Sequence, residues 1–283
     1  MSWLEDDVLA IVYECGLVEV LESESRSLLA SRKFDKQITG VCGKVIDEYT
    51  ELYILFKGGD LACMHVRDGV WMTIWSVSCG TAISFAKPIL LNKDGVIVHV
   101  RSGQHVVAFT RVADGKSVAE LDIGTLVDAK GIITGSCVRE STVALLTESG
   151  LIVEVDGAEG VQRMSRVVFP VDPQNESVIP TAIESMTDGT LAVGFSNGLV
   201  SSASGEKVYL STKGGIGCIR NLPQSSTVVV GTWKGNLFCV ANETALDLQS
   251  PHACNVCQVA VSPSGGRMAV ASTDGRVSVW NLS

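Results

Sequence analysis

The sequence predicts an all-β fold, and three observations carry this prediction. First, one hairpin pattern recurs along the chain: a β-prone run, a short turn that contains glycine, and a second β-prone run. Second, 28 glycines are spread over the 283 residues and separate these runs. Third, no segment keeps a helical apolar period for more than a turn or two. The repeated unit is therefore expected to consist of strands.

The hairpin occurs seven times, and its spacing predicts the architecture. The seven copies begin near Val8, Leu52, Ile89, Thr142, Thr190, Thr227 and Arg267. Their turn glycines are Gly16, Gly59, Gly95, Gly150, Gly198, Gly235 and Gly275. The successive gaps are 43, 36, 55, 48, 37 and 40 residues. A period of about 40 residues with strand chemistry is typical of β-propeller blades. Glycine suits these turns because it adopts positive φ without steric cost.

Each gap has room for two further strands, so each repeat is expected to hold four. The candidates are "VWMTIWSV" and "GTAISFA" after the second hairpin, "KVYLST" and "GIGCIRNL" after the fifth, and "TALDLQ" and "NVCQVAV" after the sixth. The longest gap is expected to contain a long loop over residues 113–131. The sequence thus predicts one seven-bladed β-propeller domain over residues 1–283, with four antiparallel strands per blade.

One blade is expected to be incomplete. The last blade has three candidate strands, at residues 255–262, 267–272 and 276–281, and no residues remain for a fourth. The segment Met1–Asp7 is too short to supply both the inner strand of the first blade and an outer strand for the last. We therefore expect an incomplete first or last blade, left with three strands or completed by a strand from a partner chain.

The composition indicates a globular chain from a reducing compartment. Apolar residues make up 46% and charged residues 19%, and no apolar run reaches the roughly 18 residues of a membrane span. The start "MSWLEDDVLA" is acidic where a secretory signal is basic. Nine cysteines, an odd number and mostly in apolar runs, favour free thiols over disulfides. We expect a cytoplasmic or nuclear protein. A net charge of −9 without a basic run disfavours binding to nucleic acid.

The last repeat resembles the WD40-repeat family. It runs from His252 through "VAVSPSGGRMAVAS" to Asp274, Gly275 and Trp280. In that family a histidine, a hydroxyl, an aspartate and a tryptophan form a buried hydrogen-bonded set that ties the inner strands of a blade together. The resemblance gives this structural role to His252, Ser272, Asp274 and Trp280. The other six repeats depart from the set, and their aspartate-equivalent positions hold Cys15, Gly58, Asp94, Ser149, Asn197 and Lys234. The chain is thus similar to a divergent WD40-like propeller.

Few segments offer candidate chemistry. "HACNVC" at 252–257 brings a histidine and two cysteines together, but Cys254 and Cys257 lie on opposite faces of a strand, so we expect no metal site. "KGGIGCI" at 213–219 lacks both a following helix and a Lys-Ser/Thr pair, so we expect a loop between blades and no phosphate site. His65 and His99 lie near strand ends, where packing explains them. We expect no enzymatic activity and no cofactor.

The tryptophans carry the expectation of partner binding. Trp71 and Trp75 are four residues apart in one expected strand, which predicts a shared face that packs between blades. Trp233 lies in the hairpin turn "TWKGN", and an exposed tryptophan is a frequent binding hot spot. In a WD40-like propeller such turns share one rim. That rim would carry Lys57, Asp60, Lys93, Asp94, Glu148, Asn197, Trp233, Lys234 and Arg276.

The mixed charges of these turns favour a protein or peptide partner over a polyanion. The sequence therefore predicts a non-enzymatic protein–protein interaction scaffold, a subunit or adaptor of an intracellular multi-protein complex. The alternative is a module that binds a small ligand, a modified nucleotide or a modified peptide at the top rim or in the channel. In that alternative, Trp233 would stack on a base or on a methylated cation.

Overall fold

The computed structural model of the chain consists almost entirely of strands. It describes residues 1–80, 86–91, 95–101, 105–126, 131–139, 141–156, 160–167, 178–203, 214–241 and 244–282. The one helix in these ranges is α1 (Ile123–Leu126). Contacts divide the chain into two compact units, Met1–Asp128 and Ala129–Ser283. Within the described ranges no helix has the length and apolar character to cross a membrane.

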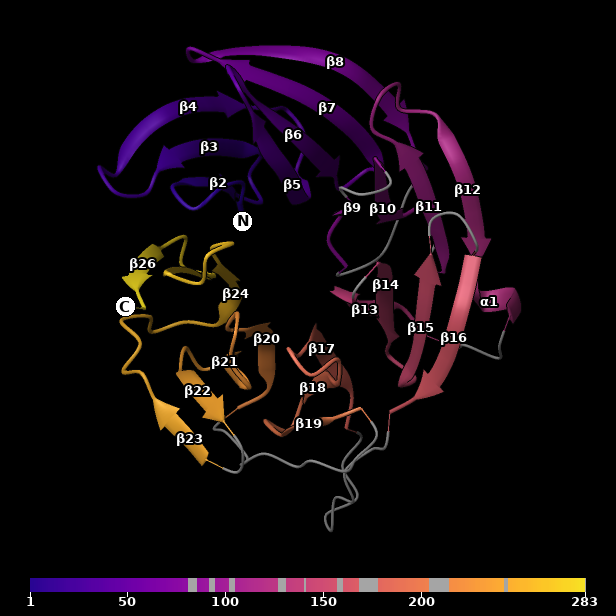
Figure 1. Cartoon of the computed structure of the whole chain (residues 1–283), viewed down its shortest axis with the longest axis vertical. Coiled ribbons are helices and arrows are strands. Elements are labelled where there is room, and N and C mark those ends of the chain that lie inside the picture. The colour runs from indigo at the N-terminus through magenta and orange to yellow at the C-terminus, as the bar shows by residue number, and fades with distance from the viewer. Residues whose placement is uncertain are drawn as a thin grey trace. The chain divides into compact units, whose positions relative to one another are not determined.

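The unit Met1–Asp128 contains three antiparallel sheets, each with four described strands (Figure 1). The first sheet contains β1 (Ser2–Trp3), β2 (Val8–Val12), β3 (Leu17–Glu22) and β4 (Ser27–Lys33). The second contains β5 (Ile38–Ile46), β6 (Tyr49–Phe56), β7 (Asp60–Arg67) and β8 (Val70–Ser78). The third contains β9 (Ile89–Leu91), β10 (Val96–Val100), β11 (Val106–Arg111) and β12 (Ser117–Asp122).

The unit Ala129–Ser283 contains four antiparallel sheets. The fourth sheet of the chain contains β13 (Ile133–Arg139), β14 (Thr142–Thr147), β15 (Leu151–Asp156) and β16 (Gly160–Arg166). The fifth contains β17 (Pro180–Ser185), β18 (Leu191–Phe195) and β19 (Val200–Ser202). The sixth contains β20 (Ile216–Asn221), β21 (Thr227–Thr232), β22 (Leu237–Ala241) and β23 (Thr244–Asp247). The seventh contains β24 (Val256–Val261), β25 (Arg267–Ser272) and β26 (Val277–Asn281).

These seven successive sheets are the blades of a seven-bladed β-propeller, so the predicted fold class is confirmed. All seven predicted hairpins form, and each joins two neighbouring strands of one sheet. The seven turn glycines all have positive φ, between 59° and 95°. A residue with a Cβ is strained in this region, which explains why glycine recurs at the turns.

The long loop predicted over residues 113–131 is wrong in part. Ser117–Asp122 forms β12, which pairs with β11, and α1 follows it directly. All but one of the β12 side chains are exposed, so the strand has no buried face. It therefore lacks the apolar alternation by which a strand is recognised in sequence. Most of "GTAISFA" and all of "KVYLST" fall outside the described residues, at 81–85 and 204–213.

A β-bulge in β8 corrects the expected placement of its two tryptophans. The register of β8 on β7 shifts, because Met64 pairs with Thr73 whereas Cys63 pairs with Trp75. Ile74 is the extra residue of the bulge. An extra residue reverses the side of the sheet to which the following side chains point. The two tryptophans therefore do not share a face, although they are four residues apart.

The rings of Trp71 and Trp75 lie on opposite faces of the second sheet. Trp71 packs against Phe34, between β4 and β5, with ring centroids 6.1 Å apart and planes at 82°. Trp75 Nε1 donates at 2.8 Å to the carbonyl oxygen of Val112, the residue that follows β11 of the third sheet. The expectation that these rings pack between blades is thus confirmed, one on each side of the sheet.

The last sheet has three strands among the described residues, as does the fifth. Its strands β24, β25 and β26 agree with the predicted strands to within one residue at each end. The N-terminal strand β1 pairs with β2 and belongs to the first sheet. In the part of the chain that the structure describes, β26 is hydrogen-bonded to β25 alone. The prediction of an incomplete blade is therefore confirmed for the last sheet.

Candidate functional site

The four residues assigned to the structural set lie in one hydrogen-bond network in the last sheet. His252 Nδ1 is 2.8 Å from Ser272 Oγ, and Ser272 also donates to the Asp274 carboxylate. This bond holds the pKa of Asp274 below its usual range. His252 Nε2 is 2.9 Å from Ser278 Oγ, to which Trp280 Nε1 donates at 2.9 Å. Trp280 thus joins the set through Ser278, which the sequence analysis did not identify.

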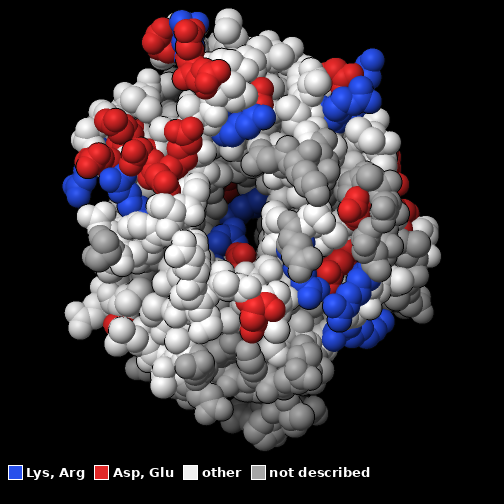
Figure 2. Space-filling model, viewed as in Figure 1, with Lys and Arg blue, Asp and Glu red and all other residues white. Residues whose placement is uncertain are grey.

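The turn residues expected to contact a partner differ in their ion pairs and in their exposure. Lys57 pairs with Glu14 at 3.3 Å, and both side chains are exposed. Asp60 pairs with Lys36, and this hydrogen bond lowers the pKa of Asp60. Lys93 and Asp94 lie outside the described residues. In the unit Ala129–Ser283, the exposed members are Glu148, Asn197, Trp233, Lys234 and Arg276. Acidic and basic side chains both occur on the face drawn in Figure 2.

Trp233 has the most specific geometry of these residues. Its backbone N–H donates to the carbonyl oxygen of Gly215 at 2.8 Å, which fixes the turn on the segment before β20. A Cβ placed on Gly215 would lie 2.6 Å from Cζ3 and 2.7 Å from Cδ2 of the indole, with Cε3 closer still. Three adjacent ring carbons at such similar distances mean that this point lies over the face of the ring. One face of Trp233 therefore rests on Gly215.

The glycines of the segment "KGGIGCI" lie directly against this turn. A Cβ on Gly214 would meet Lys234 Cγ at 2.9 Å, and a Cβ on Gly217 would meet Trp233 Cδ1 at 3.4 Å. Only glycine at position 215 leaves room for the indole to lie flat on the backbone. Trp233 is nevertheless 46% exposed, so a large part of its indole is open to solvent. We call Trp233, seated on Gly215 and Gly217, the Trp233 platform.

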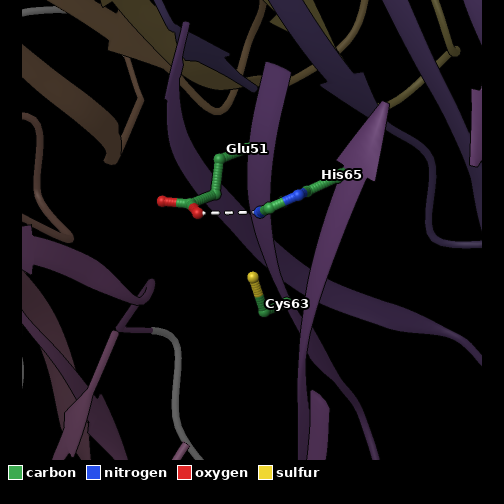
Figure 3. Close-up of side chains that lie close together, drawn as sticks. All are labelled: Glu51, Cys63 and His65. Atoms are coloured by element: carbon green, nitrogen blue, oxygen red, sulfur yellow. Dashed lines mark hydrogen bonds and ion pairs between the residues drawn. The ribbon is translucent and has the colours of Figure 1, made fainter. Parts of the chain in front are cut away.

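A second group of polar side chains lies on β6 and β7 and was missed by the sequence analysis (Figure 3). Glu51 Oε2 is 3.0 Å from His65 Nε2, and Tyr53 donates to Glu51 Oε1. The thiol of Cys63 points toward the Glu51–His65 pair. Glu51 is 7% and Cys63 1% exposed, and burial raises the pKa of the Cys63 thiol to about 12. The ring of Tyr49 stacks on His65, with centroids 4.1 Å apart.

The "HACNVC" segment forms no comparable group. Cys254 and Cys257 are both exposed, and the Cys257 thiol donates to the carbonyl oxygen of Ala271. Within the described ranges, the one set of three potential metal-ligating side chains with mutually close ligand atoms is Glu51, Cys63 and His65. The sequence signal for it was the Cys-x-His spacing on one strand, which places both side chains on the same face.

No protein-family model matches the sequence, and no curated protein matches it. Solved structures do resemble it in fold. The crystal structure of Raptor from Chaetomium thermophilum aligns with a TM-score of 0.75 and 13% identity, over 100% of this chain and 27% of the Raptor chain. A chain in the crystal structure of the Mitotic Checkpoint Complex aligns with a TM-score of 0.69 and 13% identity, over 99% of this chain and 86% of that chain. The present chain thus spans about a quarter of Raptor, and the likeness at 13% identity concerns the fold alone.

Proposed function

We propose that this protein is a non-enzymatic protein–protein interaction scaffold, a subunit or adaptor of an intracellular multi-protein complex. The observation that carries the proposal is the Trp233 platform. Tryptophan is enriched among the residues that dominate binding energy, because it buries a large area with few rotatable bonds. Trp233 is already fixed by Gly215, so little side-chain entropy is lost when a partner covers its free face.

The fold and the last repeat support this proposal. One of the similar structures is a chain of an assembly that is named as a complex. The bonds of His252 and Asp274 to Ser272 match the structural role that the WD40 resemblance implies, and we propose that the chain is a divergent relative of that family. His252 is thus engaged in holding its sheet together and is not offered for catalysis. Five buried free cysteines suit a cytoplasmic or nuclear location.

The edge of β26 is a second place where a partner could add to the fold. The strand pairs with β25 on one side, and a strand of another chain would extend the sheet by main-chain hydrogen bonds. β26 carries no charged residue, and charges are a common protection of sheet edges. We include strand donation by a partner in the proposed function.

Affinity purification with variants of the folded chain tests the proposal. Baits would be the wild type, Trp233→Ala and Leu246→Ala. Leu246 is 67% exposed on β23, so it is a matched control in the same sheet as Trp233. A hot-spot tryptophan contributes about 2 kcal/mol or more, which is about 30-fold in Kd. We expect a reproducible partner that Leu246→Ala retains and Trp233→Ala loses. Failure of the wild type to hold any partner in mild salt would contradict the proposal, and equal recovery by all three baits would exclude the Trp233 platform as the binding surface.

The open face of the indole also supports the alternative of a small-ligand site. A free aromatic face binds nucleobases by stacking and methylated ammonium groups by cation–π attraction. Titration of nucleotides, cap analogues and methyl-lysine peptides, followed by tryptophan fluorescence and thermal shift, would detect either. Because the chain has five tryptophans, the signal is assigned by difference from Trp233→Phe. No response to any of these ligands would exclude the alternative.

A further inference from the structure

We propose that Glu51, Cys63 and His65 bind one zinc ion, with water as the fourth ligand. These are the residue types that bind Zn²⁺ in proteins, through a carboxylate oxygen, a thiolate and an imidazole nitrogen. Their ligand atoms all lie within 4.8 Å of one another. The ion would cross-link two neighbouring strands of the second sheet, a role separate from the Trp233 platform.

The sheet register brings the three ligands to one face. Glu51 on β6 pairs directly with His65 on β7, and Cys63 precedes His65 by two residues. Directly opposed residues and residues two apart on a strand point to the same side of a sheet. The register therefore keeps these three side chains next to one another on one face of the sheet. The geometry belongs to the rigid ladder of β6 and β7 and does not depend on a loop.

The present distance between the Glu51 and His65 ligand atoms is close to that around a coordinated ion. Zinc bonds of about 2.0–2.2 Å to oxygen and nitrogen in a tetrahedral site place those two ligands about 3.3 Å apart. Glu51 Oε2 and His65 Nε2 are 3.0 Å apart. The Cys63 thiol points toward this pair (Figure 3). An ion among the three would require only a small opening of the pair and an approach of the sulfur.

Neighbouring side chains already hold the ligands in orientation. Tyr53 donates to Glu51 Oε1, so the carboxylate presents Oε2 to His65 and to the proposed ion. Tyr49 stacks on the imidazole with planes at 30° and restricts its rotation. Such outer contacts orient metal ligands and are typical of built metal sites. His65 has 20% of its side chain exposed, so the group is not sealed from solvent.

The charges balance when the ion binds. The S–H bond of Cys63 breaks, the zinc–sulfur bond forms, and the proton passes to the solvent. Two negative ligands, Glu51 and the Cys63 thiolate, then neutralise Zn²⁺. Lys44 pairs with the other oxygen of Glu51 at 3.7 Å and is itself 37% exposed, so solvent attenuates its repulsion of the ion. A thiolate and an imidazole select zinc over Mg²⁺ or Ca²⁺, which prefer oxygen ligands.

Metal binding by the full-length chain tests this inference. The metal-free protein, prepared with a chelator, would be titrated with Co²⁺ as a spectroscopic substitute and with Zn²⁺ in a thermal-shift assay. We expect one Co²⁺ per chain, with the near-ultraviolet charge-transfer band of a thiolate ligand, and a higher Tm with Zn²⁺. Both signals should be lost in Cys63→Ala. They should persist in Cys42→Ala, because Cys42 is equally a buried thiol of the same sheet but lies outside the group.

A second variant keeps the test decisive if Cys63→Ala does not fold. In His65→Gln, the amide can still donate to Glu51 but supplies no imidazole ligand, so we expect metal affinity to fall by about 100-fold or more with the fold retained. The inference is overturned if the wild type binds neither ion, if the thiolate band survives in Cys63→Ala, or if His65→Gln binds as tightly as the wild type.

Discussion

The turn glycine Gly59 offers the sharpest test of how the repeated hairpins are built. It has a φ of +86°, and a Cβ at this position would overlap the backbone carbonyl oxygen of Gly80. Replacement by alanine costs about 1–2 kcal/mol for the left-handed conformation alone. Relief of the overlap also displaces the bond from Cys79 N to Gly59 O, worth about 1 kcal/mol. We expect Gly59→Ala to lose about 3 kcal/mol and to lower the Tm by about 10 °C.

Two other glycines separate the causes of this loss. The preceding residue, Gly58, has no atom within 4 Å of a built Cβ, and its φ is not positive, so Gly58→Ala should be neutral or slightly stabilising. Gly275 has a φ of +80° but open space around its Cβ, so Gly275→Ala should lose only the cost of the left-handed conformation, about 1–2 kcal/mol. Urea denaturation followed by circular dichroism gives the three values. Equal losses for Gly59→Ala and Gly58→Ala would refute the reasoning.

Three further predictions concern buried polar groups. Arg139→Met should cost about 2–3 kcal/mol in urea denaturation, because it removes the 2.6 Å partner of buried Glu154. Burial lowers the pKa of His99 to about 4, so between pH 6.5 and 4 the unfolded chain binds a proton that the folded chain does not. The free energy of unfolding should therefore fall by about 3 kcal/mol as the pH drops through that window. The variant His99→Gln should show a smaller decline. Ser278→Ala should cost about 1–2 kcal/mol in the same assay, because it removes the hydrogen-bond partner of both His252 Nε2 and Trp280 Nε1.

Each of these predictions has a control or a contradicting result. Lys57→Met breaks an ion pair whose side chains are both exposed, and it should change stability by no more than about 0.5 kcal/mol. A loss as large as that of Arg139→Met would mean that burial is not the cause. Parallel pH curves for the wild type and His99→Gln would remove His99 as the source of acid sensitivity. Unchanged stability in Ser278→Ala would show that Trp280 and His252 do not depend on this hydroxyl.

The predictable part of this protein is its local chain chemistry. The seven hairpins follow from β-prone runs around glycines with positive φ. Both features depend on residues that are adjacent in sequence, so a short window of sequence reveals them. β12 escaped prediction because its side chains are exposed and its pairing comes from β11, so no pattern within the segment reveals it. The bulge at Ile74 escaped for a related reason, since the register of β8 is set by its partner strand.

The candidate sites also have a part that the sequence predicts and a part that depends on the tertiary structure. The sequence by itself determined the hairpin period, the propeller fold class, the structural group around Ser272 and the presence of Trp233 in a turn. Only the tertiary structure decided that Trp233 lies flat on Gly215, which comes from an earlier strand connection. Likewise, Glu51 meets Cys63 and His65 only because β6 and β7 pair in one register. The physical reason is that period and turn chemistry are local, whereas contacts across strands depend on register, which no single segment specifies.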